Sequence, residues 1–287
     1  MVLDRLIVII VVAVIACGSI AVNVSFDKNY HITWGNSHVK SINQGNQIDL
    51  LMDQSSGAGF ESNVGYGSGF FQIKVKLPQK DFSGVVVAFY LTSDINGKGG
   101  NHDELDFEFL GSDGPPFTLQ TNVFADDAGG REQRFHLWFD PTSDFHTYGI
   151  LWNQHQIVFY VDNTPIRVFK NNTNIGVNYP SQQMVIQGSI WNGEDWASGG
   201  RKIDWTKAPF VASYQGFEVT ACQFKSAPNK DECYISNPTQ WWNGDKYIQL
   251  DPAQHKALQD ARTKYMFQDY CTSKAKIDKE CGINSTT

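Results

Sequence analysis

The chain has 287 residues, with 23 Lys and Arg against 30 Asp and Glu, and a formal net charge of -7. This acidic balance and the absence of any Lys/Arg-rich run argue against a nucleic-acid partner, because proteins that bind nucleic acids carry basic patches. The length is compatible with one large β domain or with two domains.

The N-terminus has the pattern of a secretion signal. Residues Leu6 to Ala16 form an unbroken apolar run behind Arg5, and the small residues that follow permit cleavage after Gly18 or Ala21. The run is shorter than the roughly 20 apolar residues that a transmembrane helix needs, and no second such run occurs. We therefore expect residues 1–21 to be a signal peptide and the mature protein to be secreted without a membrane anchor.

From Tyr30 to about Gln223 the chain has the pattern of an all-β domain. Short strand-like stretches are separated by Gly, Asn and Asp, as in β-sandwiches and jelly rolls. Asp162-Asn163-Thr164 indicates a hairpin turn between two of them, because Asx residues tolerate tight turns. The predicted strands are Gln47 to Met52, Gly69 to Leu77, Gly84 to Leu91, Leu105 to Leu110, Thr118 to Phe124, His146 to Trp152, Gln156 to Val161, Pro165 to Phe169 and Met184 to Ser189.

The most informative of these stretches reads His-Asp-Glu-Leu-Asp-Phe-Glu and starts at residue 102. Successive side chains of a strand point to opposite faces, so Glu104, Asp106 and Glu108 share one face. Leu105 and Phe107 share the other face, which suits a hydrophobic core. Because like charges crowded on a strand oppose folding, the three acids indicate a functional site.

The spacing of the acids suits cleavage of a glycosidic bond by two carboxyl groups. Glu104 and Glu108 lie about 13 Å apart along a strand, and their side chains can close most of that gap. Retaining glycosidases hold the two carboxyls about 5 to 5.5 Å apart and inverting ones about 6.5 to 9.5 Å apart; we favour retention. Asp106 lies between them, close enough to hydrogen-bond one carboxyl and to separate their pKa values. The eight Trp residues and the many Asn, Gln and Gly also suit a carbohydrate-binding groove.

Two other structures could explain the acidic strand. One is a solvated edge strand, and the other is a Ca²⁺ site, since hard cations also favour clustered carboxylate oxygens. An EF-hand loop is excluded, because the chain lacks its Asp-x-Asx-x-Asx-Gly pattern. We expect no metal site and no cofactor.

The last part of the chain, residues 222–287, differs from the β-rich part and reads as an extension of it. Asp251-Pro252 offers an N-cap and a first-turn proline, and apolar residues follow at helical spacing. These features predict one amphipathic helix from about Pro252 to Tyr270, packed on a β domain that spans residues 22–221.

The cysteines also point to an oxidising compartment. Four of them remain once Cys17 leaves with the signal peptide, and short loops favour Cys222–Cys233 and Cys271–Cys281 among the three possible pairings. A Cys₄ zinc site is the alternative, although the tight spacing of such sites is absent. Glycosylation sequons stand at Asn23, Asn171 and Asn284, and we expect Asn171 and Asn284 to be used.

With these features, the chain resembles the plant xyloglucan endotransglucosylase/hydrolases of glycoside hydrolase family 16 over nearly the whole mature chain. The matching segments are Ile32-Thr33-Trp34-Gly35, Asp53-Gln54-Ser55-Ser56-Gly57, Ala88-Phe89-Tyr90-Leu91, residues 102–111, Gln120-Thr121-Asn122, Arg131-Glu132-Gln133, residues 137–142, His146-Thr147-Tyr148 and Ile190-Trp191-Asn192. The resemblance implies a concanavalin A-like jelly-roll sandwich with a curved substrate-binding sheet, extended by a C-terminal segment. It also implies that Glu104 is the nucleophile, Glu108 the general acid/base and Asp106 the residue that assists the nucleophile.

Matching positions further imply which residues contact the glucan. They are Tyr90, Glu108, Gln120, Thr121, Asn122, Gly130, Arg131, Glu132, Trp191, Trp196, Ala197 and Gly200. The two Trp residues lie in a polar, Gly-rich stretch, which favours stacking on sugars over the core packing that is common for Trp. Period two places Gln120 and Asn122 on one strand face and Thr121 on the other. Arg131 and Glu132 could equally form a surface ion pair.

The chain departs from the family pattern at several places. The sequon that many members carry after the catalytic strand is replaced by Gly111-Ser112-Asp113-Gly114-Pro115-Pro116, and the loop Ser93 to Asn101 is longer and richer in Gly than usual. Lys274-Ala275-Lys276-Ile277 replaces an Arg-aromatic-Pro element that helps to bind acceptor sugars, and lysine lacks the planar fork of arginine. Donor and acceptor preferences therefore do not follow from the resemblance.

The leading hypothesis is a secreted enzyme of the plant cell wall and apoplast that cuts xyloglucan and rejoins it to another glucan chain or to water. One alternative is the same chemistry on cellulose or mixed-linkage glucan. A second is a non-catalytic jelly-roll lectin, which would gain nothing from crowded carboxylates. The expected partners are a polysaccharide donor and acceptor, and we expect a monomer.

Overall fold

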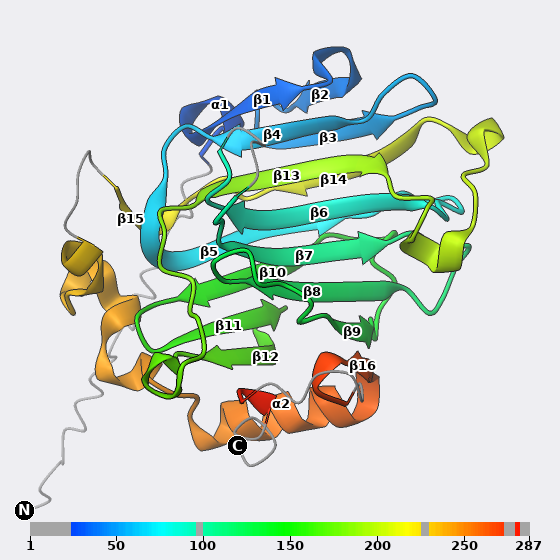
Figure 1. The fold of residues 1–287 in the computed structure, drawn as a ribbon. Coiled ribbons are helices and arrows are strands. Elements are labelled where there is room, and N and C mark those ends of the chain that lie inside the picture. The colour runs from blue at the N-terminus through cyan, green and yellow to red at the C-terminus, as the bar shows by residue number, and fades with distance from the viewer. Residues whose placement is uncertain (1–23, 96–99, 225–229, 273–278, 282–287) are drawn as a thin grey trace, which may run out of the picture.

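A computed structural model describes residues 24–95, 100–224, 230–272 and 279–281. Two antiparallel β-sheets pack face to face (Figure 1), so the predicted all-β sandwich is confirmed. The first sheet has the strand order β1-β4-β13-β6-β7-β8-β9-β16, and the second has the order β12-β11-β10-β5-β14-β3-β2, with β15 paired to β5.

The strands of the first sheet are β1 (Tyr30–Trp34), β4 (Ala58–Ser62), β13 (Val185–Asn192), β6 (Val85–Thr92), β7 (Glu104–Leu110), β8 (Thr118–Phe124), β9 (Gln133–His136) and β16 (Met266–Asp269). The strands of the second sheet are β12 (Thr164–Lys170), β11 (Gln156–Val161), β10 (His146–Trp152), β5 (Tyr66–Lys76), β14 (Phe210–Gln215), β3 (Gln47–Met52), β2 (Val39–Ile42) and β15 (Thr220–Gln223). The α-helices of the described residues are α1 (Phe26–Asn29) and α2 (Pro252–Tyr265). Short 3₁₀ helices are η1 (Asn36–His38), η2 (Thr173–Ile175), η3 (Ala197–Gly200), η4 (Trp205–Lys207), η5 (Lys230–Tyr234), η6 (Pro238–Asn243), η7 (Asp245–Tyr247) and η8 (Tyr270–Thr272).

All nine predicted strands are present. β3, β8, β10 and β11 have the predicted bounds, and the other five differ from prediction by one to three residues at their ends. The predicted hairpin joins β11 to β12, and its turn residues Asp162 and Asn163 both adopt positive φ angles, of 46° and 66°. This conformation suits a tight hairpin turn and is one that Asx residues tolerate well.

The core side of β7 is held by aromatic packing between the sheets. Leu105, Phe107 and Phe109 are fully buried. The Phe107 ring meets Tyr148 of β10 and Phe159 of β11 edge-on, at centroid distances of 5.7 and 5.2 Å. Burial of each such side chain contributes about 1.5–3 kcal/mol, so the sandwich holds this face of β7 inward and the acidic face outward.

The C-terminal helix begins where the sequence predicts and ends earlier. The Asp251 side chain accepts a hydrogen bond from the backbone of Gln254, whose side chain bonds back to the Asp251 backbone. This capping box satisfies two backbone donors at the start of α2. The predicted end at Tyr270 is wrong, because the chain turns extended at Met266 and forms β16 against β9. Pairing with the open edge of β9 satisfies backbone groups that a longer helix would leave unpaired there.

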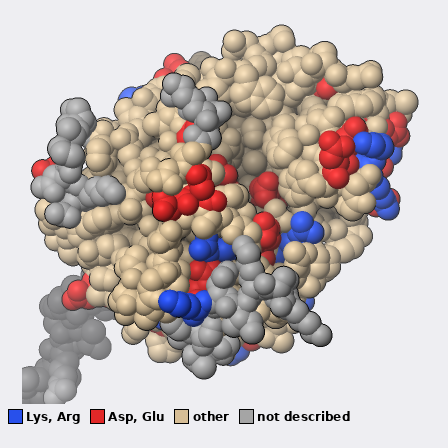
Figure 2. Space-filling view, in the orientation of Figure 1, with Lys and Arg blue, Asp and Glu red and all other residues tan. Residues whose placement is uncertain are grey.

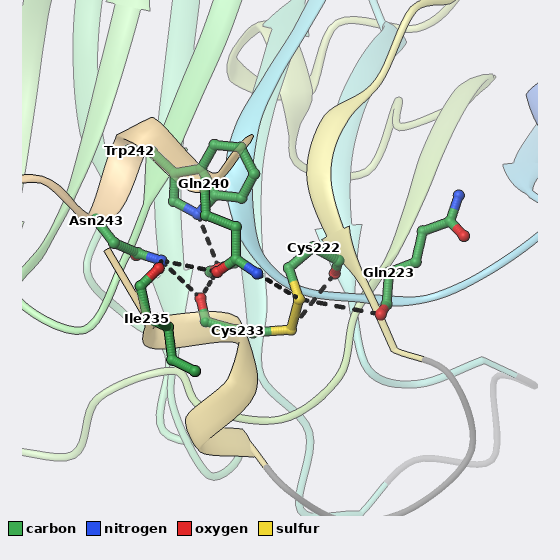
Figure 3. Close-up of a disulfide and its surroundings, with 8 residues drawn as sticks. Cys222, Gln223, Cys233, Ile235, Gln240, Trp242 and Asn243 are labelled. Carbon is green, nitrogen blue, oxygen red and sulfur yellow. Dashed lines mark hydrogen bonds between the residues drawn. A yellow bond between two sulfur atoms is a disulfide. The ribbon is translucent and has the colours of Figure 1, made fainter. Parts of the chain in front are cut away.

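Both predicted disulfides are present, so the alternative of a Cys₄ zinc site is excluded. Cys222 of β15 bonds to Cys233 of η5 (Figure 3), and Cys271 bonds to Cys281. Around the first disulfide, Trp242 Nε1 donates to Ser68 Oγ at 2.9 Å, and Ser68 Oγ donates to the Cys233 carbonyl. This disulfide therefore fastens η5 and η6 to the second sheet.

Several sequence predictions fall outside the described residues. These are the signal peptide at 1–21, the sequons at Asn23 and Asn284, and the Lys274 to Ile277 segment. Asn171 is half-buried, and its Nδ2 donates to the Gln154 carbonyl at 2.8 Å, so its glycosylation stays a prediction. Among the helices that the structure describes, none is long and apolar enough to cross a membrane.

Candidate active site

A cleft of about 800 Å³ lies on the outer face of the first sheet, over the acidic side of β7. Figure 2 shows Asp and Glu side chains gathered around a hollow in the middle of this face. The residues that line the cleft are Trp34, Ala88, Tyr90, Glu104, Asp106, Glu108, Gln120, Asn122, Phe124, Glu132, Arg134, Ser189, Trp191, Trp196 and Gln268. The three acids predicted from the period of the strand therefore lie together on the floor of one cleft.

Strand pairing places a set of neighbours beside each acid. Asp106 lies between Tyr90 of β6 and Asn122 of β8, in direct cross-strand register. Directly opposed residues of an antiparallel pair point to the same face, so these side chains enter the cleft together.

The residues that pair in register with Glu108, strand after strand, form a row across all eight strands of the sheet. From β1 to β16 its members are Trp34, Gly59, Ser189, Ala88, Glu108, Gln120, Arg134 and Gln268. Seven strand spacings make this row about 34 Å long. On the β1 side of Glu108 the side chains are small or absent until Trp34, whereas on the other side they are long and polar. The cleft is therefore long, open, and different in its two halves.

The first half ends at the indole of Trp34, which lies against Gly59. A Cβ atom at Gly59 would stand 2.3 Å from Trp34 Nε1, so only glycine allows this arrangement. Trp34 keeps 41% of its surface exposed. An exposed, held aromatic ring at this point offers a stacking surface for a ligand.

Glu108 is held from the β8 side by two hydrogen bonds in series. Arg134 Nε donates to Gln120 Oε1 at 2.6 Å, and Gln120 Nε2 donates to Glu108 Oε2 at 2.5 Å. Burial raises the pKa of Glu108, and the charges of Glu104 and Glu132 raise it further, against the lowering effect of Gln120. The net effect is to keep this carboxyl protonated to a higher pH than an exposed glutamate.

Glu104 has more groups that favour its ionised form. Burial raises its pKa, and the charge of Asp94 adds to this rise, but the hydroxyl of Thr92, the imidazole of His102 and the carboxyl of Asp106 all act against it, so that the pKa is raised on balance. The pKa of Asp106 is raised well above its usual range by burial and by the charges of Glu104 and Glu108 on either side. A protonated Asp106 donates its hydrogen bond to Glu104, which stabilises negative charge there. The two glutamates thus have different environments, as an acid and a nucleophile require.

Two tryptophans form the wall of the cleft next to β13. The rings of Trp191 and Trp196 lie 6.0 Å apart at 41°, and Trp196 is 40% exposed. Beneath them Ala197 is fully buried with Val86 and Leu110, in a small cluster against which Trp191 packs. Trp191 and Trp196 therefore present ring surface to the cleft, whereas Ala197 supports it from below.

The structure does not bring all the predicted contact residues into the cleft. Thr121 is fully buried and accepts a hydrogen bond from Arg167 Nη1 at 2.9 Å, as expected for the core side of β8. The guanidinium of Arg131 is also buried, where it pairs with Glu280, so the alternative of a surface ion pair between Arg131 and Glu132 is excluded. Gly130 lies in an exposed loop and Gly200 at the exposed end of η3, with φ angles of 76° and 79°. None of these four lines the cleft, and the same holds for Ala197.

Sequence reasoning missed several residues that do line it. Arg134 lies on β9 and Gln268 on β16, two four-residue strands that were not predicted. Trp34 was noted within a matching segment but was not assigned to the site. Arg134 follows Gln120 by fourteen residues and lies opposite it on the next strand of a meander. The sequence could have indicated this position only if the pairing of the two strands had been known.

Among the described residues, no group of three or more His, Cys, Asp and Glu side chains is arranged to hold a metal ion. The carboxyls of β7 are instead engaged with Gln120, Thr92 and one another. The arrangement is suited to proton transfer and nucleophilic attack by carboxyl groups.

Comparison with known proteins agrees with this geometry. Residues 26–207 match the family described as glycosyl hydrolases family 16. The chain is 54% identical to xyloglucan endotransglucosylase/hydrolase protein 2 of Arabidopsis thaliana over 267 residues, which are 91% of this chain and 90% of the relative. It is 50% identical to protein 3 of the same name and organism over 265 residues, 90% of this chain and 89% of the relative.

Among solved structures, the fold matches the Bacillus licheniformis beta-glucanase with a TM-score of 0.53 and 22% identity, over 65% of this chain and 89% of that chain. This likeness concerns the fold alone and confirms the jelly-roll sandwich. The family match and the sequence relatives lead to one conclusion: the chain belongs to glycosyl hydrolases family 16 and, within it, to the xyloglucan endotransglucosylase/hydrolases.

Proposed function

We propose that the protein is a retaining endotransglucosylase/hydrolase that cleaves a β-1,4-glucan, with xyloglucan as the first donor, and passes the glycosyl group to another glucan chain or to water. The observation that carries this proposal is the position of the three carboxyls of β7, which lie together on the floor of an open cleft that crosses the whole sheet. An open cleft of this length accommodates the interior of a polymer chain, whereas a closed pocket would accept only its end.

The surroundings of the carboxyls support distinct roles. Glu104 is the nucleophile, because Thr92, His102 and the proton of Asp106 stabilise its ionised form. Glu108 is the general acid, because burial and the charge of Glu104 hold its proton. Asp106 assists Glu104 and keeps the two glutamate pKa values apart.

The reaction proceeds in two displacements. Glu108 donates its proton to the glycosidic oxygen while a Glu104 oxygen attacks the anomeric carbon, so that the glycosidic bond breaks and the reducing-end portion leaves as an alcohol. The ionised Glu108 then removes a proton from a hydroxyl of an acceptor sugar or from water. The oxygen so activated attacks the anomeric carbon and releases Glu104, and the original configuration returns.

The hydrogen bonds of the two glutamates also support an orientation for the substrate. Glu104 bonds to Thr92 on β6, and Glu108 bonds to Gln120 on β8. The glycosyl group bound to the nucleophile therefore lies toward β6, β13, β4 and β1, with Trp34 at the far end. The leaving group and the incoming acceptor lie toward β8, β9 and β16, beside Gln120, Arg134 and Gln268. We call these the donor half and the acceptor half of the cleft.

The proposal extends to the organisation of the chain. Residues 1–21 act as a signal peptide, 22–221 as the catalytic domain and 222–287 as an extension that completes the acceptor half through β16. The two disulfides support an extracellular location, because disulfides persist in oxidising compartments. The family membership supports the plant cell wall as the place of action, and a single chain supplies every residue of the proposed mechanism.

The test of this proposal is the variant Glu104→Ala with xyloglucan and a fluorescent xyloglucan oligosaccharide. We expect no transfer and no new reducing ends, with binding of the polysaccharide retained. The matched control is Glu218→Ala, which removes an exposed glutamate away from the cleft. Undiminished turnover by Glu104→Ala would refute the mechanism.

A panel of donors separates xyloglucan from cellulose and mixed-linkage glucan, and incorporation of the label separates transfer from hydrolysis. Azide then distinguishes the roles of the two glutamates on an activated glycosyl fluoride donor. Glu104→Ala should form the α-glycosyl azide through a single displacement, and Glu108→Ala the β-glycosyl azide through two. If none of the three polysaccharides binds to Glu104→Ala, the circular dichroism spectrum of this variant shows whether it is folded.

A further inference from the structure

A buried ion pair joins the end of the chain to the turn beside the acceptor half of the cleft. Arg131 Nε donates to Glu280 Oε1 at 2.7 Å, and the two side chains are only 9% and 2% exposed. The pair connects positions 149 residues apart in sequence. Neither side chain lines the cleft, so the mechanism above does not use them.

On its other side, the guanidinium of Arg131 holds the turn that follows β8. Arg131 Nη1 donates to the Val123 carbonyl at 3.3 Å and also to the Ala128 carbonyl. The same group lies over the Phe169 ring of the second sheet, 5.5 Å from its centroid. Arg131 thus fixes the path of the chain between the end of β8 and the start of β9.

That path determines how two cleft residues are oriented. The backbone N–H of Arg131 donates to Asn122 Oδ1 at 3.0 Å, which turns the amide NH₂ of Asn122 toward Glu132 Oε1 at 3.5 Å. The Glu132 carbonyl accepts a hydrogen bond from the backbone N–H of Tyr270 at 3.1 Å. Asn122 and Glu132 both line the cleft, so the chain of contacts runs from Glu280 through Arg131 to the acceptor half.

Glu280 is itself held in place by the C-terminal disulfide. It precedes Cys281, which bonds to Cys271, and its carboxyl interacts with the hydroxyl of Tyr270. Arg167, a second buried cation, lies with its guanidinium over the ring of the same Tyr270, 5.7 Å from the centroid. A carboxylate buried among two arginines leaves an uncompensated charge when it is removed, so the turn that it holds has to rearrange.

We propose that Glu280 is a positioning residue for the acceptor: through Arg131 it orients Asn122 and Glu132, and the Cys271–Cys281 disulfide holds it there. The inference rests on the proposed function and on the assignment of the β8, β9 and β16 side to the acceptor. It explains why a buried arginine occurs at a position for which the family resemblance implies sugar contact. It also gives the C-terminal extension a role in acceptor binding beyond the strand β16.

The test compares Glu280→Gln with the wild type in transfer assays at varied acceptor and at varied donor. Glu280→Gln keeps the size of the side chain and removes its charge. We expect the KM for the acceptor oligosaccharide to rise about ten- to a hundredfold, since small misplacements of binding groups have effects of this order. The KM for the donor polysaccharide and the rate of hydrolysis, in which water replaces the acceptor, should stay at wild-type values.

Three further variants keep the test decisive. Glu280→Asp retains the charge and should recover part of the acceptor affinity, and it serves in place of Glu280→Gln if that variant does not fold. Asp260→Asn removes an exposed charge from α2 and should leave every constant unchanged. Replacing Cys222 and Cys233 by Ser opens the other disulfide, at the second sheet, and should lower stability without a change in acceptor KM.

The outcomes separate the inference from the function on which it rests. If the wild type shows no activity on any glucan, the proposed function fails. If the wild type is active and folded Glu280→Gln has a normal acceptor KM, or if its donor KM and hydrolysis rate change equally, the positioning role of Glu280 is refuted. An acceptor defect in the Cys222/Cys233 variant as large as that of Glu280→Gln would likewise refute it, because the effect would then reflect stability alone.

Discussion

Replacing Gln120 by Met tests how the proton of Glu108, the proposed general acid, is held. In the wild type, Gln120 Nε2 donates to Glu108 Oε2 at 2.5 Å and lowers the pKa of Glu108 against the raising effect of burial. Methionine has a similar length and no donor. The variant therefore removes one stabilising contact of the ionised Glu108 while it keeps the shape of the cleft floor.

The size of the effect follows from the kind of hydrogen bond that is lost. A hydrogen bond to a charged group contributes about 1.5–3 kcal/mol, and Gln120 is only 4% exposed, so water does not readily replace it. Since one pKa unit corresponds to about 1.4 kcal/mol, the pKa of Glu108 should rise by about one to two units. Arg134 loses its acceptor in the same variant, and its attraction for Glu108 offsets part of the loss, which favours the lower value.

The assay is the pH dependence of kcat/KM for xyloglucan. With Glu108 as the proposed acid, activity falls as pH rises through its pKa, and a higher pKa moves this alkaline limb to higher pH by about one unit. The acidic limb, which reports ionisation of Glu104, should stay in place. Arg134→Met should move the alkaline limb in the same direction by less, because Arg134 also lowers this pKa. A Gln120→Met profile that is lower at every pH but unshifted would show that Gln120 only binds substrate, and the reasoning would be refuted.

Two predictions concern stability. Because the folded pKa of Asp106 is raised, the folded state holds a proton that the unfolded chain releases, so stability falls as pH rises from the unfolded pKa to the folded one. Asp106→Asn should therefore have a higher Tm than the wild type at pH 7. The difference in Tm should vanish near pH 3, below the ordinary pKa of aspartate. Equal Tm values at pH 7 would contradict the raised pKa of Asp106. Phe107→Ala should lower the free energy of unfolding by about 3–5 kcal/mol in denaturant titrations, because it leaves a cavity between the sheets. Phe267→Ala, at a ring that is 49% exposed, is its control and should cost much less.

The sequence by itself determined the two faces of the catalytic strand. The alternation of Glu104, Asp106 and Glu108 with Leu105 and Phe107 has only one arrangement that buries the apolar set, because the side-chain period of a strand is two. The two disulfides between closely spaced cysteines and the start of α2 after its N-cap Asp251 were predictable for a related reason. Each depends on residues that are near one another in the chain.

Other features depend on which strands become neighbours, and the sequence pattern does not specify this. Arg134 and Gln268 enter the cleft because β9 pairs with β8 and β16 pairs with β9. Four-residue strands carry too little periodicity to be recognised, and the edge of β9 ends the helix at Tyr265, five residues before the predicted end. Trp34 reaches the same row through two further pairings, from β1 to β4 and from β4 to β13.

Arg131 shows the limit most clearly. The family resemblance implies contact with sugar, and the neighbouring Glu132 offers a surface pair, whereas the guanidinium of Arg131 is buried against Glu280, 149 residues later. The local sequence determines which side chains share a face of a strand, since backbone geometry imposes that period. Only the tertiary structure decides what each face contacts, since long-range pairing depends on the packing of the whole sandwich. At Arg131 this packing buries a residue that was expected to contact sugar and places it beneath the cleft.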